Sequence, residues 1–205
     1  PMALLQNKPV LEHLLELCKF NGYVDIVLLV HYEYQKIKEY FNNGEKWGVN
    51  ITYVIENQPR GTSGALYDAL EYLSDHFFVL YGDTYLDVNF ESFRSFHVQN
   101  NSDVSIFLHP NSHPSDSDII EIDSNNAVTE IHPYPHSNEK YLPNLVNAAF
   151  YFMNKSSLEG AVPITGKYDL AKNTFPYLLR TNHRNSKNSL ILVVSSFVFQ
   201  LSFRN

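Results

Sequence analysis

The apolar and polar positions of the first half of the chain alternate between a helical period and short apolar runs. Residues 9–20 carry apolar side chains at three- and four-residue spacing, which predicts an amphipathic helix that ends at Gly22. Residues 25–30 form a short apolar run, the pattern of a strand buried on both faces. A second helix is predicted over residues 34–41 and a second strand over residues 50–55.

A third helix and a third strand continue this order. Residues 62–73 have a helical pattern, and Thr62 or Ser63 is the expected N-cap because a hydroxyl accepts hydrogen bonds from the free amides of a helix start. Residues 76–80 form an apolar strand that stops before Gly82 and Asp83. Strands that alternate with helices predict a parallel sheet with right-handed crossovers.

The second half of the chain is richer in strands. After a helix near residues 90–97, strands are predicted at residues 104–108, 119–122, 128–131 and 147–153, followed by a helix at residues 168–179. Asn125 and Asn126 indicate a hairpin between two of these strands. The predicted fold class is α/β, a three-layer, Rossmann-like and mostly parallel sheet with a β-rich second half. We expect one core over residues 1–182 and a divergent tail over residues 183–205.

Composition and charge narrow the class of protein. The 205 residues are 44% hydrophobic and 18% charged, as in ordinary globular domains. A net charge of -7 argues against a nucleic-acid partner, because phosphate backbones select basic faces. The apolar stretches at residues 24–30 and 190–203 are shorter than the roughly 18 residues of a membrane span, so no membrane partner is expected. One cysteine, Cys18, and the lack of a signal peptide favour a cytoplasmic protein.

The first chemical signal lies where the third predicted strand ends. Asp83 follows an apolar strand, so its carboxylate lies at the carboxyl end of a parallel strand, where open α/β sheets bind ligands. Gly82 lets a ligand approach the backbone, and one carboxylate suits Mg2+, which combines one or two carboxylates with phosphate oxygens. A solvated aspartate in an ordinary turn is the alternative.

A second signal is the loop at residues 56–65, between a predicted strand and a helix. Its glycines and backbone amides could cradle an anion or bind a base, although their spacing matches neither a P-loop nor a dinucleotide fingerprint. An ordinary strand-to-helix loop is the alternative. Since both loops follow consecutive parallel strands, the joint prediction is a nucleotide in one loop and its metal in the other.

Five ordered segments resemble the sugar-1-phosphate nucleotidyltransferase family. They are residues 8–13, 59–66, 80–83 and 146–151, with Phe175 and Pro176 in a late helix. Their order and spacing hold from residue 1 to about residue 179. The resemblance implies an enzyme that forms an NDP-sugar and pyrophosphate from an NTP and a sugar 1-phosphate, by in-line displacement assisted by Mg2+.

The resemblance also implies nucleotide-binding and catalytic residues. Asp83 would be the catalytic residue that coordinates the Mg2+ bridging the triphosphate. The nucleotide-binding residues would be Gln58, Gly61, Thr62 and Gly82. The loop at Gln58 leaves the base open.

Sugar-binding residues follow from the same resemblance. Asn147 would hydrogen-bond sugar hydroxyls, and Glu130 and His132 lie where many members carry a Glu-Lys-Pro segment, here without its lysine. Together with residues 116–118, this segment resembles a branch that handles heptose phosphates and is sometimes fused to a phosphatase domain. A homo-oligomer is a further expectation. The aspartates of residues 116–118 have a polar turn as their alternative.

Two other patterns have simpler interpretations. His132 and His136 are spaced like a metal pair, but the intervening prolines prevent a helix and no third ligand is evident, so zinc is not expected there. Asp169 lies where a helix is predicted to begin, which favours a helix cap.

The chain departs from the family pattern at both ends. It starts just after the position of a glycine-rich loop with its arginine and a following lysine, so the first strand is missing, and it has no late Asp-x-Gly-Thr segment for a second metal ligand. The 205 residues by themselves are therefore expected to have little activity. The alternatives are a nucleotide-sugar-dependent glycosyltransferase, although Asp83 and Asp87 are four apart rather than Asp-x-Asp, and a non-catalytic remnant that binds nucleotide or sugar phosphate.

Overall fold

The structure, a computed structural model, describes residues 1–111, 114–136, 142–185 and 191–194. The α-helices are α1 (Val10–Phe20), α2 (Tyr34–Phe41), α3 (Gly61–Asp68), α4 (Phe90–Gln99) and α5 (Phe175–Asn185). The strands are β1 (Leu4–Leu5), β2 (Lys8–Pro9), β3 (Asp25–Val30), β4 (Asn50–Ile55), β5 (His76–Leu80), β6 (Val104–His109), β7 (Ile119–Ile122), β8 (Val128–His132), β9 (Val146–Asn154) and β10 (Ile191–Val194).

The strands pair in both directions. β3 and β4 form a parallel pair, and a larger sheet runs in the order β10-β6-β9-β7-β8, with β5 also paired to β9. β9 is antiparallel to β5, β6 and β7, whereas β10 is parallel to β6. The predicted α/β class is confirmed, and so is the hairpin, which β7 and β8 form.

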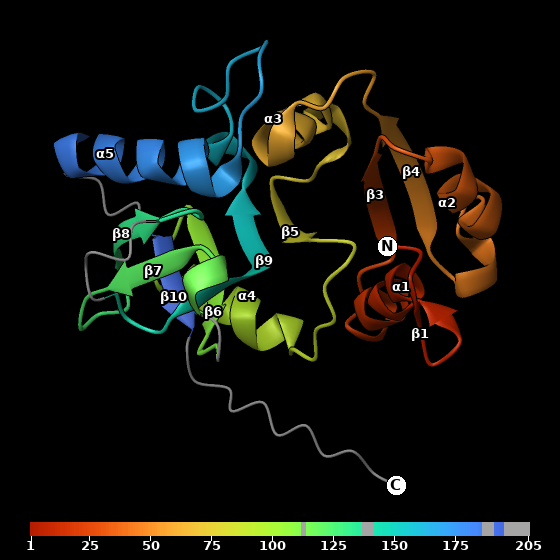
Figure 1. The fold of residues 1–205 in the computed structure, drawn as a ribbon, viewed down its shortest axis with the longest axis horizontal. Coiled ribbons are helices and arrows are strands. Elements are labelled where there is room, and N and C mark those ends of the chain that lie inside the picture. The colour runs from red at the N-terminus through yellow and green to blue at the C-terminus, as the bar shows by residue number, and fades with distance from the viewer. Residues whose placement is uncertain (112–113, 137–141, 186–190, 195–205) are drawn as a thin grey trace, which may run out of the picture.

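One predicted pairing differs from the structure. The first three long strands were expected in one parallel sheet, but in the described part of the chain no ladder joins β3 or β4 to β5. Figure 1 shows β3 and β4 beside α1 and α2, apart from the larger sheet. β5 runs antiparallel along β9, from His76 opposite Asn154 to Leu80 opposite Phe150. An apolar run shows that a strand is buried on both faces, but any neighbouring strand can accept its hydrogen bonds.

Alternate residues of β9 enter two different hydrophobic cores. Tyr151 and Met153 pack in a core that includes residues of α3 and α5, whereas Phe150 and Phe152 pack in a core with α4 and part of α1. In Figure 1, α3 and α5 lie on one side of the large sheet and α4 on the other. Side chains that alternate across a strand thus join three layers around β9.

The start of α3 differs from the predicted N-cap. The helix begins at Gly61, and neither Thr62 nor Ser63 caps it. Their hydroxyls instead form hydrogen bonds with Asp169 and Thr174. A distant segment therefore replaces the local cap. That segment opens as a π-helical turn, Leu170–Thr174, which leads into α5.

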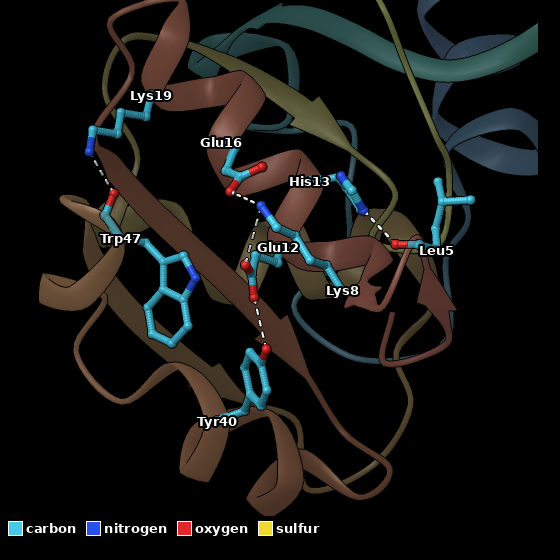
Figure 2. Close-up of polar contacts among 8 residues, drawn as sticks. All are labelled: Leu5, Lys8, Glu12, His13, Glu16, Lys19, Tyr40 and Trp47. Carbon is cyan, nitrogen blue, oxygen red and sulfur yellow. Dashed lines mark hydrogen bonds and ion pairs between the residues drawn. The ribbon is translucent and has the colours of Figure 1, made fainter. Parts of the chain in front are cut away.

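Helix α1 connects to neighbouring elements by polar contacts. The Tyr40 hydroxyl donates to Glu12 at 2.9 Å, and the Lys19 ammonium donates to the carbonyl of Trp47, also at 2.9 Å. Figure 2 marks both contacts with dashed lines. Lys8 forms ion pairs with Glu12 and Glu16. These contacts hold α1 to α2 and to the turn before β4.

The described helices are all too short or too polar to cross a membrane. Within the predicted tail, residues 183–185 end α5 and residues 191–194 form β10. The rest of residues 183–205 lies outside the described residues, so the tail stays a prediction.

Candidate functional site

An open cavity of about 350 Å³ lies next to the carboxyl end of β5 and the start of β9. Segments that are far apart in the sequence line it. They include Thr62, Tyr81, Asp118, Tyr134, Asn147 and Lys172. Two residues singled out in the sequence, Thr62 and Asn147, thus meet in one cavity.

Asn147 is held in one orientation at this cavity. Its Nδ2 donates to the Tyr151 hydroxyl at 2.8 Å, and its Oδ1 accepts from the amide of Ala149 at 3.0 Å. A side-chain amide offers two N–H donors and two acceptor positions, so it can make these bonds and still bind a ligand. The geometry suits an asparagine that recognises a hydroxyl group.

The backbone beside Asn147 is irregular. Ala149 has φ 55°, a left-handed conformation uncommon for a residue with a side chain. The register of β6 against β9 shifts between Ile106 and Leu108, next to this point. Such irregularities concentrate near functional sites because they change where a side chain points. Both Asn147 and Ala149 line the cavity.

Asn147 is hydrogen-bonded to a tyrosine of the protein interior. Tyr151, which accepts this hydrogen bond, is fully buried, and its ring lies edge-on to that of Tyr81 with the ring centres 6.1 Å apart. Burial raises the pKa of Tyr151 well above its usual value and also raises the pKa of Tyr81. Both phenols therefore stay neutral and act as hydrogen-bonding groups rather than as bases.

The glycine-containing loop before α3 is anchored to the backbone of Tyr168. The amides of Ser63 and Gly64 donate to the Tyr168 carbonyl at 3.0 and 3.3 Å, and the Tyr168 amide donates to the Arg60 carbonyl at 2.7 Å. Gly61 has φ 75°, and a Cβ there would lie 2.3 Å from the Tyr168 oxygen. The amides of Ser63 and Gly64 are thus satisfied by the protein itself and not by an anion.

Thr62 and Asp169 join this loop to the segment before α5. The Thr62 hydroxyl donates to Asp169 Oδ2 at 2.9 Å and accepts from the amide of Leu170 at 2.8 Å. Asp169 Oδ1 accepts from the amides of Ala171 and Lys172, so the predicted helix cap is confirmed. Asp169 also lines the cavity, which the sequence did not indicate.

Charged groups of both signs line the cavity. Asp116, Asp118 and Asp169 supply carboxylates, and Lys172 supplies an ammonium group. Asp118 has a structural role as well: its Oδ1 accepts from the amide of Tyr134 at 2.9 Å, and its carbonyl accepts from the amide of Asn147 at 3.0 Å. Carboxylates suit sugar hydroxyls, which donate hydrogen bonds, and an ammonium group suits a phosphate.

Asp83 lies just outside the cavity lining. Its side chain is exposed, in a turn closed by a hydrogen bond from the Thr84 amide to the carbonyl of Tyr81. Gly82 in this turn faces Pro1, whose ring would be 3.6 Å from a Cβ at Gly82. Gln58 is exposed in the loop after β4. Tyr81 is therefore the link between the Asp83 turn and the cavity.

Glu130 and His132 lie on β8 and are not among the residues that line the cavity. His132 Nε2 is 2.8 Å from Glu121 of β7. His136 Nε2 instead contacts the carbonyl of Ser117 at 3.2 Å. The two histidines therefore face different partners.

Four residues of this region were not assigned from sequence: Tyr81, Tyr134, Tyr151 and Lys172. Tyr81 and Tyr151 belong to segments that carry the family resemblance, so their place in the motif was the available signal. Tyr134 lies in the stretch of residues 130–136 that takes the place of the family's Glu-Lys-Pro segment, whereas Lys172 has no comparable local pattern. Only the folded chain brings them to the cavity.

These features define an α/β domain with a polar cavity at the ends of its strands, the usual ligand position in such sheets. The chain belongs to the nucleotidyl transferase family, whose model matches residues 1–190. The predicted family is confirmed.

Known relatives agree with this assignment. The chain is 39% identical over 94 residues to D-glycero-alpha-D-manno-heptose 1-phosphate guanylyltransferase of Campylobacter jejuni. The matched residues make up 46% of this chain and 42% of the relative. The chain is 31% identical over 185 residues to mannose-1-phosphate guanyltransferase of Yarrowia lipolytica, covering 87% of this chain and 49% of the relative. The chain thus spans about half the length of these relatives.

Solved structures share the fold. HddC from Yersinia pseudotuberculosis superposes with a TM-score of 0.77 at 22% identity, covering 95% of this chain and 80% of that one. The same protein complexed with GMP-PN superposes with a TM-score of 0.77 at 21% identity, covering 96% of this chain and 80% of that one.

Proposed function

We propose that this chain is the core of an enzyme that forms an NDP-sugar and pyrophosphate from an NTP and a sugar 1-phosphate. The proposal rests on one observation: two hydrogen bonds orient the Asn147 side chain in a polar cavity beside the Asp83 turn. Membership of the nucleotidyl transferase family supports it and sets aside the glycosyltransferase alternative.

The two substrates would occupy neighbouring places. Asn147 and Asp118 offer the donors and acceptors that sugar hydroxyls need, and Lys172 offers a positive charge for the sugar phosphate. Gln58, Gly61, Thr62 and Gly82 remain the proposed nucleotide-binding residues. Because the amides of Ser63 and Gly64 bind Tyr168, recognition of the base would rest mainly on the exposed Gln58 side chain. Glu130 and His132 remain proposed sugar-binding residues, on the strand that leads from the hairpin turn to the cavity residue Tyr134.

The proposed reaction is a direct displacement. An oxygen of the sugar phosphate attacks the α-phosphorus of the NTP, a new phosphorus–oxygen bond forms, and the bond to pyrophosphate breaks with its electron pair leaving on pyrophosphate. No covalent intermediate on the protein is needed, so the side chains orient the substrates and stabilise charge.

Asp83 fits the role of an Mg2+ ligand. Its carboxylate is exposed at the end of a strand, and Mg2+ combines one or two carboxylates with phosphate oxygens. The ion would neutralise charge on the triphosphate. Asp83 would hold it there, and the Tyr81–Thr84 turn would fix the position of the carboxylate.

The relatives guide the choice of substrates. Both curated relatives are named as guanylyltransferases, of a heptose 1-phosphate and of mannose 1-phosphate, which favours GTP with either sugar phosphate. These substrates are soluble in water, which is consistent with the proposed cytoplasmic location. A homo-oligomer or a fused phosphatase domain remains a proposal that size-exclusion chromatography and the complete gene sequence would test.

The test is release of pyrophosphate from GTP by the complete gene product that contains these residues, with and without sugar 1-phosphate and Mg2+. We expect release only when all are present. Asp83→Ala should abolish turnover, while Asp87→Ala, which removes another exposed carboxylate of the same loop, should retain it. An unchanged rate in Asp83→Ala would remove Asp83 from the metal role. Calorimetric binding of GTP without turnover would favour the non-catalytic alternative.

A further inference from the structure

The β7–β8 hairpin carries a cluster of three metal-ligating side chains outside the cavity. Glu121, Glu130 and His132 place one ligand atom each so that all lie within 4.8 Å of one another. His132 Nε2 is 2.8 Å from Glu121 and 3.8 Å from Glu130. The imidazole distinguishes this cluster from an ordinary acidic surface patch.

Strand register brings the two carboxylates together. Glu121 and Glu130 are directly opposite each other across the antiparallel ladder, and like charges in such a pair destabilise a hairpin. His132 is two residues from Glu130, so it points to the same face of β8. The ladder is irregular immediately beyond this pair, between Glu121 and Ile122. The hairpin therefore concentrates negative charge around an imidazole nitrogen.

The cluster lies between solvent and the protein interior. The side chain of His132 is 14% exposed, that of Glu121 30% and that of Glu130 55%. An ion could enter from the Glu130 side, while the largely buried imidazole would fix its inner coordination position. Ligand atoms on a tetrahedral zinc ion are about 3.3–3.6 Å apart, given bond lengths of about 2.0–2.2 Å. The present separations range from 2.8 Å to at most 4.8 Å, so small side-chain rotations suffice.

We propose that Glu121, Glu130 and His132 form a binding site for a divalent transition metal ion, with Zn2+ as the best match. The two carboxylates, and not His136, supply the further ligands that the sequence alone did not show for His132. Imidazole nitrogen with carboxylate oxygen is a ligand set that Zn2+ accepts, whereas Mg2+ prefers oxygen ligands alone. Solvent would complete the coordination. The site is separate from the proposed Mg2+ position at Asp83 and does not depend on the proposed reaction.

The position of the cluster indicates a structural role. Ile119 of β7 and His132 of β8 are paired at the open end of the hairpin. Asp118 directly precedes Ile119, and Tyr134 follows His132 by two residues, and both line the cavity. The Tyr134 amide donates to Asp118 at 2.9 Å. An ion that binds both strands would stabilise this pairing and, through it, one wall of the cavity.

Calorimetric titration of the untagged protein with Zn2+ tests the site. We expect one Zn2+ per chain that excess Mg2+ does not displace. The Kd should rise at least about tenfold in His132→Gln, since the loss of even an outer-shell partner weakens metal binding by tenfold or more. Glu130→Gln provides a second variant at an exposed position where folding is not at risk, and circular dichroism checks both variants. Zn2+ should also raise the Tm of the unaltered protein, and at the same Zn2+ concentration it should raise that of His132→Gln by less.

Two controls locate the ion. His13→Gln, on α1, should leave the Kd for Zn2+ unchanged, and so should Asp83→Ala. Absence of Zn2+ binding, or equal affinity in the unaltered protein and both hairpin variants, would overturn the proposal and leave the cluster as an ion pair. Loss of binding in His13→Gln or Asp83→Ala would equally overturn it, because the ion would then lie elsewhere.

Discussion

At the scale of single residues, the site depends on polar groups that the interior holds in place. Tyr151 is fully buried, yet its hydroxyl is the acceptor that orients Asn147. A buried polar group that loses its hydrogen-bond partner destabilises the fold by more than the bond itself contributes. Buried polar groups therefore persist only when each one has a hydrogen-bond partner.

Tyr151→Phe tests this orientation. Removing the hydroxyl deprives Asn147 of an acceptor, so we expect the KM for the sugar phosphate to rise up to about tenfold, with a stability loss of about 1 kcal/mol. Steady-state kinetics or calorimetric titration with the sugar phosphate measures the first effect and urea unfolding the second. Tyr177→Phe, at an exposed position, is the control and should change neither. An unchanged KM in Tyr151→Phe would show that the hydroxyl does not position Asn147.

His97 makes stability depend on pH. It is buried, with Nδ1 2.9 Å from the Ser105 hydroxyl and Nε2 3.0 Å from Asn154 Oδ1. Burial lowers the pKa of His97, His76 lowers it further, and Asn154 and Asp103 oppose the shift. The unfolded chain therefore binds a proton more readily than the folded chain. The contribution of His97 to the free energy of unfolding is complete above about pH 6.5, which is the ordinary pKa of histidine. This contribution is lost as the pH falls below that value.

Denaturant unfolding at pH 7.5 and at pH 5.5 measures this effect. The contribution of His97 should decline by at most about 1.4 kcal/mol per pH unit, the limit for one proton. His97→Gln removes the titration and should flatten the difference between the two pH values. The same pH dependence in the variant and the unaltered protein would assign it to other groups.

At the scale of elements, Gly61 sets how closely the loop before α3 approaches the segment before α5. It combines a positive φ with a backbone contact that leaves no room for a Cβ. Gly61→Ala should therefore lower the free energy of unfolding by more than the roughly 1–2 kcal/mol that a left-handed conformation costs by itself. The substitution should therefore also weaken the contact between the start of α3 and the segment at Tyr168, which are two parts of the proposed site.

Gly22 provides the matched control. It has φ 85°, and a Cβ there would meet no atom within 4 Å. Gly22→Ala should cost only the conformational term of about 1–2 kcal/mol. Urea unfolding of both variants separates strain from the collision with Tyr168. Equal losses would show that the loop can move away from Tyr168.

At the scale of the whole molecule, β9 joins the helical layers. Phe150 is fully buried and contacts Phe78, Phe90 and Phe93, which come from β5 and α4. Tyr151 beside it packs on Phe175 of α5 on the other face. The strand that carries Asn147 is therefore also the strand that holds the layers together.

Phe150→Ala should lower the free energy of unfolding by about 3–5 kcal/mol, since it leaves a large cavity among rings that cannot all close in. Phe20→Ala removes the same side chain where it is 87% exposed, and should change stability by less than about 0.5 kcal/mol. Thermal unfolding of the two variants measures the difference. Similar losses would mean that Phe150 lies in a deformable part of the core.

Most individual elements could be predicted from the sequence, because helical and strand periods are local. Helix α1, strands β3 to β5 and the β7–β8 hairpin lie where the apolar pattern places them. The cap of α3 could not be predicted, since Thr62 and Ser63 hydrogen-bond with residues more than a hundred positions away. Of the candidate site residues, Thr62 and Asn147 meet in the cavity, while Asp83 lies beside it and Glu130 and His132 lie on the hairpin.

The sequence by itself determined the class of fold, the places of most helices and strands and the family, because apolar periodicity and short motifs are properties of neighbouring residues. The late helix is an exception, since it was predicted at residues 168–179 and α5 spans Phe175–Asn185. Only the tertiary structure decided which strands pair, which faces of β9 the helices cover, and that Asp118, Tyr134 and Lys172 share a cavity with Asn147. The physical reason is that a hydrogen-bonding edge or an apolar face accepts many partners. Packing of the whole chain selects one.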